Sequence, residues 1–305
     1  MARSYRYLHY DVFTDRLFGG NQLAVVLDGR GLTTETMQAI AKEMNFSETT
    51  FALPAENTGS DVRLRIFTPG EELPTAGHPT IGSTFALARC GVIARGRRNF
   101  VFGQNAGPTP VTMTWKGDDL SFVWMTQALP TFGTPIPDPA RTAAALSLSP
   151  AAVAGTGKPV QIVSCGVPFL FVPLTTRSAV DSVVVDQSGL DAVLRDAKTS
   201  AHGVFVFSAQ GGGKKATVYS RMFAPGMGIL EDPATGIASG PLGCYLVRHK
   251  IVPPAKAEAM VSLQGAKMGR PSHVHISIGT GKSSDINSVR VGGEAVLAGE
   301  GTLYV

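Results

Sequence analysis

Two similar halves constrain the fold of this 305-residue chain more than any other feature of its sequence. Residues 65–70, RIFTPG, return at residues 221–226 as RMFAPG. A second pair of motifs follows, HPTIG at 78–82 and DPATG at 232–236. This alignment makes the loop between the motifs two residues shorter in the second copy and pairs His78 with Asp232. Self-similarity over half a chain indicates an internal duplication.

The pattern of helices and strands supports the duplication. Residues 34–45 have apolar side chains on one helical face, and residues 50–54 read as the strand that follows. In the second half, residues 190–198 form a weaker helical pattern before a strand at 204–208. Residues 20–26 have a counterpart at 166–172. Four matching segments in one order predict an α/β (α+β) fold built from two copies of one unit.

The proline-rich stretch at 130–139 marks the expected crossing between the halves. We therefore expect a first lobe over residues 1–130 and a second over 131–295. The glycine- and lysine-rich segment 210–215 is expected to be an exposed surface loop.

Composition and charge exclude several classes of function. The net charge of +4 is scattered, and its densest run, Arg95, Arg97 and Arg98, is typical of a solvated loop rather than a nucleic-acid surface. No apolar run reaches the ~20 residues of a membrane span, and the N-terminus has no apolar signal segment. We expect a soluble, cytoplasmic protein that binds neither nucleic acid nor membrane.

The three cysteines, Cys90, Cys165 and Cys244, are far apart and lack a CxxC spacing. This pattern does not favour a disulfide framework or a metal site. Cys90 and Cys244 lie in apolar stretches and are expected to be core residues.

The two repeated motifs are expected to be helix starts. Pro79 and Pro233 suit the first turn of helices predicted at 80–89 and 238–247. A helix N-terminus presents unpaired amides and binds anions, and Gly77, Gly82 and Gly236 would let a ligand approach the backbone. The implied ligand is a small organic acid with a carboxylate. One such motif alone is more simply a helix start, but two matched motifs favour a site.

His78 and Asp232 occupy matched positions in this alignment yet differ in type. A pair with different proton affinities suits acid/base work or the holding of a polar substrate.

Glu48 lies between a predicted amphipathic helix and an apolar strand, with Phe46 and Phe51 nearby. Partial desolvation there would raise the carboxyl pKa and make it a usable general base. The same context is equally compatible with a surface glutamate in a turn. The second copy has no acid at the corresponding place, near Ala201 and His202, so the site is expected to have one base.

The sequence resembles the PhzF family of phenazine-biosynthesis isomerases over nearly its whole length. In the first half the matching segments are 11–14 (DVFT) with Gly20 and Asn21, 45–51 (NFSETTF), 65–69 (RIFTP) and 72–80 (ELPTAGHPT). In the second half they are 220–223 (SRMF), 231–236 (EDPATG), 240–243 (GPLG) and 264–272 (QGAKMGRPS).

The resemblance implies a diaminopimelate-epimerase-like fold, in which two similar lobes each wrap a sheet around a central helix and the active site lies between them. It also implies that the last strand, 296–305, returns to the first lobe. Members are commonly homodimers, and their named reaction isomerises a dihydro-hydroxyanthranilate without cofactor or metal. We therefore expect neither a cofactor nor a metal ion in this protein.

The resemblance also implies roles for individual residues. Glu48 is implied as the acid/base, and His78 and Asp232 as catalytic residues that orient polar groups of the substrate. Backbone amides of Gly77, Gly236 and Ile237 are implied to hold its carboxylate, and Asn21 is implied as a further substrate contact.

Two departures bear on the substrate. Ile237 replaces a serine usual in the family, and Thr75 replaces a phenylalanine, so the specific phenazine substrate is in doubt. A non-catalytic acid-binding homologue is the main alternative. A racemase or epimerase of the same fold, which uses two thiols at the helix starts, is disfavoured because those places hold His78 and Asp232.

Overall fold

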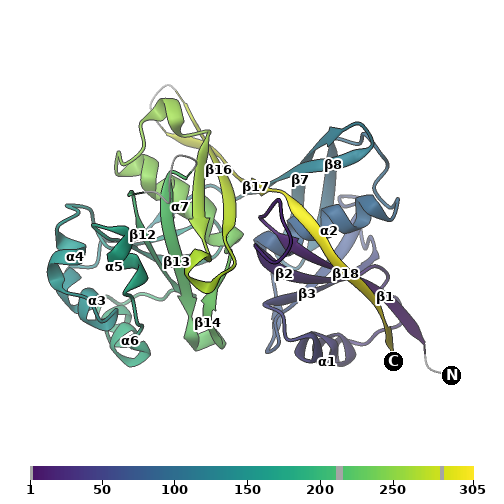
Figure 1. The fold of residues 1–305 in the computed structure, drawn as a ribbon, viewed down its shortest axis with the longest axis horizontal. Helices are drawn as coiled ribbons and strands as arrows, with labels where there is room; N and C mark the ends of the chain where they lie inside the picture. The colour runs from purple at the N-terminus through teal and green to yellow at the C-terminus, as the bar shows by residue number, and fades with distance from the viewer. Residues whose placement is uncertain (1–2, 211–215, 282–284) are drawn as a thin grey trace. The chain divides into compact units, whose positions relative to one another are not determined.

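The computed structural model describes residues 3–210, 216–281 and 285–305. Its contacts divide the chain into two compact units, one of Met1–Thr126 with Val291–Val305 and one of Gln127–Arg290. Each unit holds a sheet and one helix of 13 residues, α2 (Gly77–Arg89) in the first and α7 (Gly236–Arg248) in the second (Figure 1). The predicted two-copy α/β fold is confirmed. The loop expected at 210–215 falls largely outside the described residues.

The first unit builds one sheet around α2. Its other elements are β1 (Ser4–Val12), β2 (Asn21–Val26), α1 (Thr34–Met44), β3 (Glu48–Pro54), β4 (Val62–Phe67), β5 (Glu72–Leu73), β6 (Asn99–Gln104), β7 (Gly107–Lys116), β8 (Asp119–Gln127) and β18 (Ala295–Tyr304). Strands β2 and β3 are parallel, as are β4 and β6, whereas β1–β2, β3–β4 and β6–β7–β8 are antiparallel. Strand β18, drawn in yellow, runs antiparallel along β1 (Figure 1).

The second unit repeats this order around α7. Its elements are β9 (Thr131–Phe132), α3 (Pro139–Ala145), α4 (Pro150–Ala154), β10 (Gln161–Ser164), β11 (Pro168–Pro173), α5 (Arg177–Asp181), α6 (Gln187–Asp196), β12 (Val204–Ser208), β13 (Val218–Ala224), β14 (Ile229–Asp232), β15 (Met260–Gln264), β16 (Ser272–Thr280) and β17 (Ile286–Gly293). The parallel pairs are β11–β12 and β13–β15, at the places of β2–β3 and β4–β6. No helix in the described ranges is long and apolar enough to cross a membrane.

The two predicted helix–strand pairs are present, with small shifts. Helix α1 is capped by Thr33 and ends at Asn45, whose φ of 52° is left-handed, and it buries Met37, Ile40 and Ala41 as the periodicity predicts. The strand expected from residue 50 begins earlier, at Glu48. Helix α6 spans Gln187–Asp196 rather than 190–198, and β12 covers the predicted 204–208.

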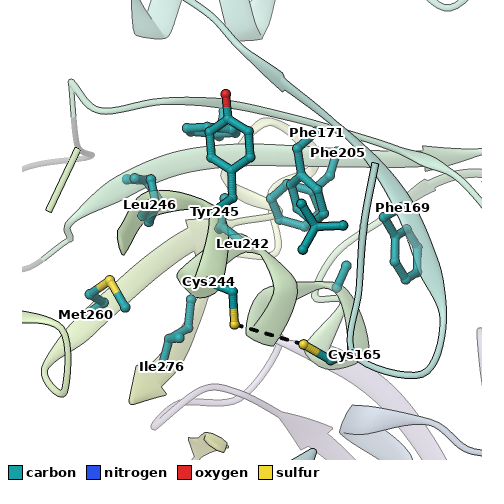
Figure 2. Packing of buried hydrophobic residues seen from close by; sticks show 14 of the residues in the cluster. Cys165, Phe169, Phe171, Phe205, Leu242, Cys244, Tyr245, Leu246, Met260 and Ile276 are labelled. Carbon is teal, nitrogen blue, oxygen red and sulfur yellow. Dashed lines mark hydrogen bonds between the residues drawn. The ribbon is translucent and has the colours of Figure 1, made fainter. Parts of the chain in front are cut away.

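The apolar core of the second unit surrounds α7. Figure 2 shows Tyr245 of α7 beside Phe171 and Phe205, with ring centroids 6.0 Å apart for Phe171–Tyr245 and 5.5 Å for Phe171–Phe205. Cys165 and Cys244 are buried in the same core with their sulfur atoms 4.0 Å apart. The hydrogen bond with Cys165 is the main cause that raises the pKa of Cys244, and burial raises it further. This thiol therefore stays protonated.

Cys90 contradicts its prediction as a core residue. It is the residue that ends α2, and it is exposed. The apolar stretch before it is buried through Leu87, and the helix leaves the core just beyond that point.

Gly82 serves packing rather than ligand approach, which corrects the sequence-based expectation. A Cβ there would lie 2.5 Å from Leu23 Cδ2 and 2.7 Å from Val12 Cγ2. Glycine therefore lets α2 approach β1 and β2 closely. Ser83 adds a polar contact on this face, with Oγ 2.9 Å from Oγ1 of Thr50 in β3.

The structure also corrects the register of the repeat. Arg65 of β4 forms an ion pair with Glu72 of β5 at 2.6 Å, and Arg221 of β13 forms the same pair with Glu231 of β14 at 2.8 Å. Each glutamate precedes the first residue of the following helix by the same distance in sequence, Glu72 before Gly77 and Glu231 before Gly236. Glu72 therefore corresponds to Glu231, and Gly77 to Gly236.

In this register His78 corresponds to Ile237, and Asp232 corresponds to Leu73, so the expected equivalence of His78 and Asp232 is wrong. Pro79 does lie in the first turn of α2, but Pro233 precedes α7 and is not helical. The misalignment arose because both motifs contain a proline, at different distances from the helix start.

Candidate active site

Glu48 is the first residue of β3 and lies next to Leu23 of β2 in the parallel ladder. Its exposed fraction is 9%, so the surface-turn interpretation of this glutamate is wrong. A carboxyl that enters a buried sheet needs polar partners, because burying an unpaired charge is costly.

His78 meets Glu48 from the first turn of α2. Its Nε2 lies 3.2 Å from Oε2 of Glu48, and its exposed fraction is 3%. On the other side of the ring, Nδ1 lies 3.3 Å from Nδ2 of Asn21, the first residue of β2. Three residues far apart in the sequence are thus brought together at one end of the strands that α2 covers.

Burial makes His78 a neutral imidazole. Desolvation lowers its pKa to about 3, while a hydrogen bond with the backbone of Gln22 acts in the opposite direction. At neutral pH the ring therefore carries one proton and offers one donor and one acceptor nitrogen. A neutral imidazole therefore lies beside the Glu48 carboxyl and places no positive charge next to it.

The two helix starts carry the backbone amides predicted to bind an anion. Within the described residues, the side chains of the two N-cap residues, Ala76 before α2 and Thr235 before α7, make no capping hydrogen bond to the helix amides. Gly77 and His78 begin α2, and Gly236 and Ile237 begin α7, so their amides lack helical partners. The side chain of Ile237 is partly buried against the core of the second unit, and its only polar atoms are those of the backbone.

Asp232 ends β14 in the second unit and is buried, with an exposed fraction of 6%. The hydroxyl of Thr235 donates a short hydrogen bond to its Oδ2. Gln264, the last residue of β15, donates from Nε2 to the Asp232 carbonyl at 2.8 Å and to Thr235 Oγ1 at 3.0 Å. Sequence reasoning gave neither Thr235 nor Gln264 a role, although both lie in segments that match the PhzF family.

The second unit lacks polar counterparts of Asn21, Glu48 and His78. Gly20 and Gly166 both have a positive φ before corresponding strands, so Asn21 corresponds to Val167. Phe67 and Phe223 pair with Thr49 and Val204, so Glu48 corresponds to Gly203 rather than to the predicted Ala201–His202 region. This register agrees with the expectation that the second unit has no acidic residue at the place of Glu48.

The thiols do not occupy the helix starts of a two-thiol racemase. Cys244 lies in the middle of α7, Cys165 precedes β11, and Cys90 follows α2. In the described parts of the chain, no cluster of three or more His, Cys, Asp or Glu residues is arranged to hold a metal ion.

The chain matches the family model described as phenazine biosynthesis-like protein over residues 10–301. It is 36% identical to an uncharacterised isomerase of Mesorhizobium japonicum, covering 98% of both chains. It is 33% identical to the trans-2,3-dihydro-3-hydroxyanthranilate isomerase of Pseudomonas aeruginosa, covering 99% of this chain and all of the relative, 100%. A solved PhzF-family protein of Bacillus anthracis superposes with a TM-score of 0.87 at 25% identity, covering 99% and 100% of the two chains.

A buried carboxyl beside an imidazole, in an α/β fold of two similar units, defines a protein equipped for proton transfer. The chain belongs to the PhzF family of phenazine biosynthesis-like proteins, and it is an isomerase of that family.

Proposed function

We propose that this isomerase moves one proton within a small carboxylate-bearing substrate, with Glu48 as the acid and base. The observation that carries the proposal is the buried Glu48 carboxyl with Oε2 3.2 Å from Nε2 of a neutral His78. General acid–base catalysis needs a group that can both take and return a proton near neutral pH.

The proposed reaction begins with proton removal from a carbon next to an unsaturated system. The electrons of the broken C–H bond form a new double bond, the existing double bond shifts, and Glu48 returns the proton to the carbon at its far end. One proton is removed and one is added, and nothing is oxidised or reduced. The balance of this reaction requires no redox cofactor.

The starts of α2 and α7, whose N-cap side chains make no capping hydrogen bond, support the proposal that the substrate carries a carboxylate. We propose that the amides of Gly77, Gly236 and Ile237 bind it. The relative in Pseudomonas aeruginosa is named for a substrate that is itself an acid, trans-2,3-dihydro-3-hydroxyanthranilate. We propose further that His78 and Asp232 hold polar groups of the substrate and that Asn21 acts through His78.

The test is Glu48→Gln with trans-2,3-dihydro-3-hydroxyanthranilate in heavy water, followed by proton NMR. Glutamine keeps the shape of the side chain but cannot cycle a proton, so turnover and deuterium incorporation should fall by roughly 10²- to 10⁴-fold. Glu43→Gln, at an exposed position on α1, is the matched control and should leave both unchanged. Equal activity of the Glu48→Gln and wild-type proteins would exclude Glu48 as the base.

The apolar side chain of Ile237 motivates the alternative of a non-catalytic acid-binding homologue. Equal binding of the carboxylate to the wild-type and Glu48→Gln proteins, without proton exchange into the ligand in either, would contradict the proposed proton transfer. A two-thiol racemase would be inactivated by thiol alkylation, and we expect no such effect.

Three family expectations stay predictions: a homodimer, residence in the cytoplasm and a place in phenazine biosynthesis. Analytical ultracentrifugation of the purified chain tests the first. Fractionation of cells and the pathway encoded by neighbouring genes test the other two.

A further inference from the structure

Gln264 makes three hydrogen bonds that converge on the Asp232 turn, and its own side chain is fully buried, with 0% exposure. Its Oε1 accepts from the backbone N–H of Thr235 at 3.1 Å. Its Nε2 donates to the Asp232 carbonyl at 2.8 Å and to Thr235 Oγ1 at 3.0 Å. Both strands that approach this turn, β14 and β15, end within it.

These contacts determine which way the amide of Gln264 points. A backbone N–H only donates and a backbone carbonyl only accepts. If the amide were flipped, its NH₂ would face the Thr235 N–H and its oxygen would face the Asp232 carbonyl. The group facing Thr235 Oγ1 is therefore an N–H donor.

The direction of the next hydrogen bond follows from this donor. Thr235 Oγ1 accepts from Gln264 and has one proton of its own to donate. That proton goes to Oδ2 of Asp232, which accepts it. The Thr235 hydroxyl therefore fixes the orientation of the Asp232 carboxyl group.

The first unit contains a similar chain of hydrogen bonds from a glutamine to a threonine, but the final acceptor is different. Gln104 ends β6 as Gln264 ends β15, and its Nε2 donates to Thr80 Oγ1 at 2.7 Å. Thr80 then donates to the backbone carbonyl of Ala76, also at 2.7 Å. In the first unit the chain of hydrogen bonds ends on the backbone of a helix start, whereas in the second unit it ends on the side chain of Asp232.

We propose that Gln264 and Thr235 are positioning residues that hold Asp232 as a dedicated hydrogen-bond acceptor for a donor group of the substrate, such as a hydroxyl or an ammonium. This rests on the proposed role of Asp232 in binding the substrate. Neither residue is proposed to touch the substrate through its side chain.

The first test uses the protein without any ligand. In the wild-type protein the Thr235 hydroxyl proton should exchange slowly with water and give a proton NMR signal, assigned by its loss in Thr235→Val. Asp232→Asn should move this signal because it replaces the carboxyl group that accepts the hydrogen bond, while the Thr80 hydroxyl signal should stay in place. A rapidly exchanging Thr235 hydroxyl, or a signal that Asp232→Asn does not move, overturns the proposal.

The second test follows turnover of trans-2,3-dihydro-3-hydroxyanthranilate. Thr235→Ser keeps the hydroxyl and should retain kcat/KM within about threefold, whereas Thr235→Val should lower it by roughly ten- to a hundredfold. Thr217→Val is the control, since its hydroxyl accepts the backbone N–H of Val261 at 3.0 Å and is not part of the Gln264–Thr235–Asp232 arrangement. Equal loss in the serine and valine variants overturns the positioning role.

The two tests separate this inference from the proposed function. A wild-type protein that does not turn over the probe excludes this anthranilate as its substrate, and the NMR result then decides the hydrogen-bond arrangement by itself.

Discussion

The two units share a framework but differ at the positions where chemistry is proposed. Both contain the Arg–Glu pair, a glutamine at the end of the matching strand and a 13-residue helix. The first unit adds Asn21, Glu48 and His78, which correspond to Val167, Gly203 and Ile237. The shared residues therefore build the fold, and the differing ones are those to which the proposed function assigns chemistry.

Backbone packing explains why the second unit has no glutamate at the place of Glu48. A Cβ at Gly203 would lie 2.7 Å from the carbonyl oxygen of Phe223, closer than any side chain tolerates. Conversely, the second unit has Asp232 and Thr235 where the first has Leu73 and Ala76. Each copy has become specialised at different positions of one ancestral framework.

The largest expected effect concerns the shared Arg–Glu pairs. Arg221 binds Glu231 and also donates to the carbonyls of Val180, Asp181 and Val183 at 3.0–3.2 Å. Arg221→Met leaves these groups without their donor and should cost about 3–5 kcal/mol of unfolding free energy. Urea denaturation measures it.

Arg65 serves as the comparison for Arg221. Its side chain is 18% exposed against 9% for Arg221, so water can replace some of its contacts. Arg65→Met should cost less, about 1–2 kcal/mol. If both variants lose the same stability, burial does not distinguish the two pairs.

Exchanging corresponding residues between the units tests where the chemistry lies. His78→Ile gives the first unit the residue of the second and should lower turnover of trans-2,3-dihydro-3-hydroxyanthranilate by roughly a hundredfold, since Glu48 loses its partner. The reverse change, Ile237→His, should affect turnover much less. A larger effect of Ile237→His, measured by the same NMR assay, would contradict the assignment of the acid/base to the first unit.

A packing effect smaller than that of Arg221→Met is expected from Gly82→Ala. The new methyl group would meet Leu23 and Val12, and such overpacking costs about 1–3 kcal/mol. Gly59→Ala is the control and should be nearly neutral, because the atom nearest to its new methyl group would be Asn57 Oδ1, at 3.5 Å. Thermal unfolding compares the two variants, and equal melting temperatures would contradict the close packing of α2.

The last comparison concerns the pH dependence that buried His78 contributes, which is absent at neutral pH and grows only as the pH falls. Its pKa is lowered from 6.5 to about 3 in the folded protein, so below pH 6.5 the unfolded chain binds a proton that the folded protein does not. Stability should therefore fall as the pH drops from 6.5 towards 3, at up to about 1.4 kcal/mol per pH unit. His78→Gln should lack this contribution, and parallel pH profiles of the wild-type and variant proteins would rule it out.

The fold was largely predictable because local patterns encode it. The face of α1 formed by Met37, Ile40 and Ala41, the strand at 204–208 and the repeated RIFTPG-like motif are all properties of neighbouring residues. The sequence also singled out Glu48 and His78, which lie 3.2 Å apart in the structure, although the resemblance to a family was needed to choose Glu48 over a surface glutamate. The exposed Cys90 was mispredicted because composition does not reveal where a helix leaves the core.

The sequence by itself determined that the chain is a duplicated α/β protein. It also indicated that Glu48 of the first half has no acidic counterpart in the second half. Only the tertiary structure decided the register of the repeat, because the Arg65–Glu72 and Arg221–Glu231 pairs join separate strands. It also brought Asn21 to His78 and made that histidine neutral, since burial and hydrogen bonding depend on segments distant in the sequence. For the same reason the Gln264–Thr235–Asp232 arrangement is visible only once β14 and β15 are paired with β13 and end at one turn.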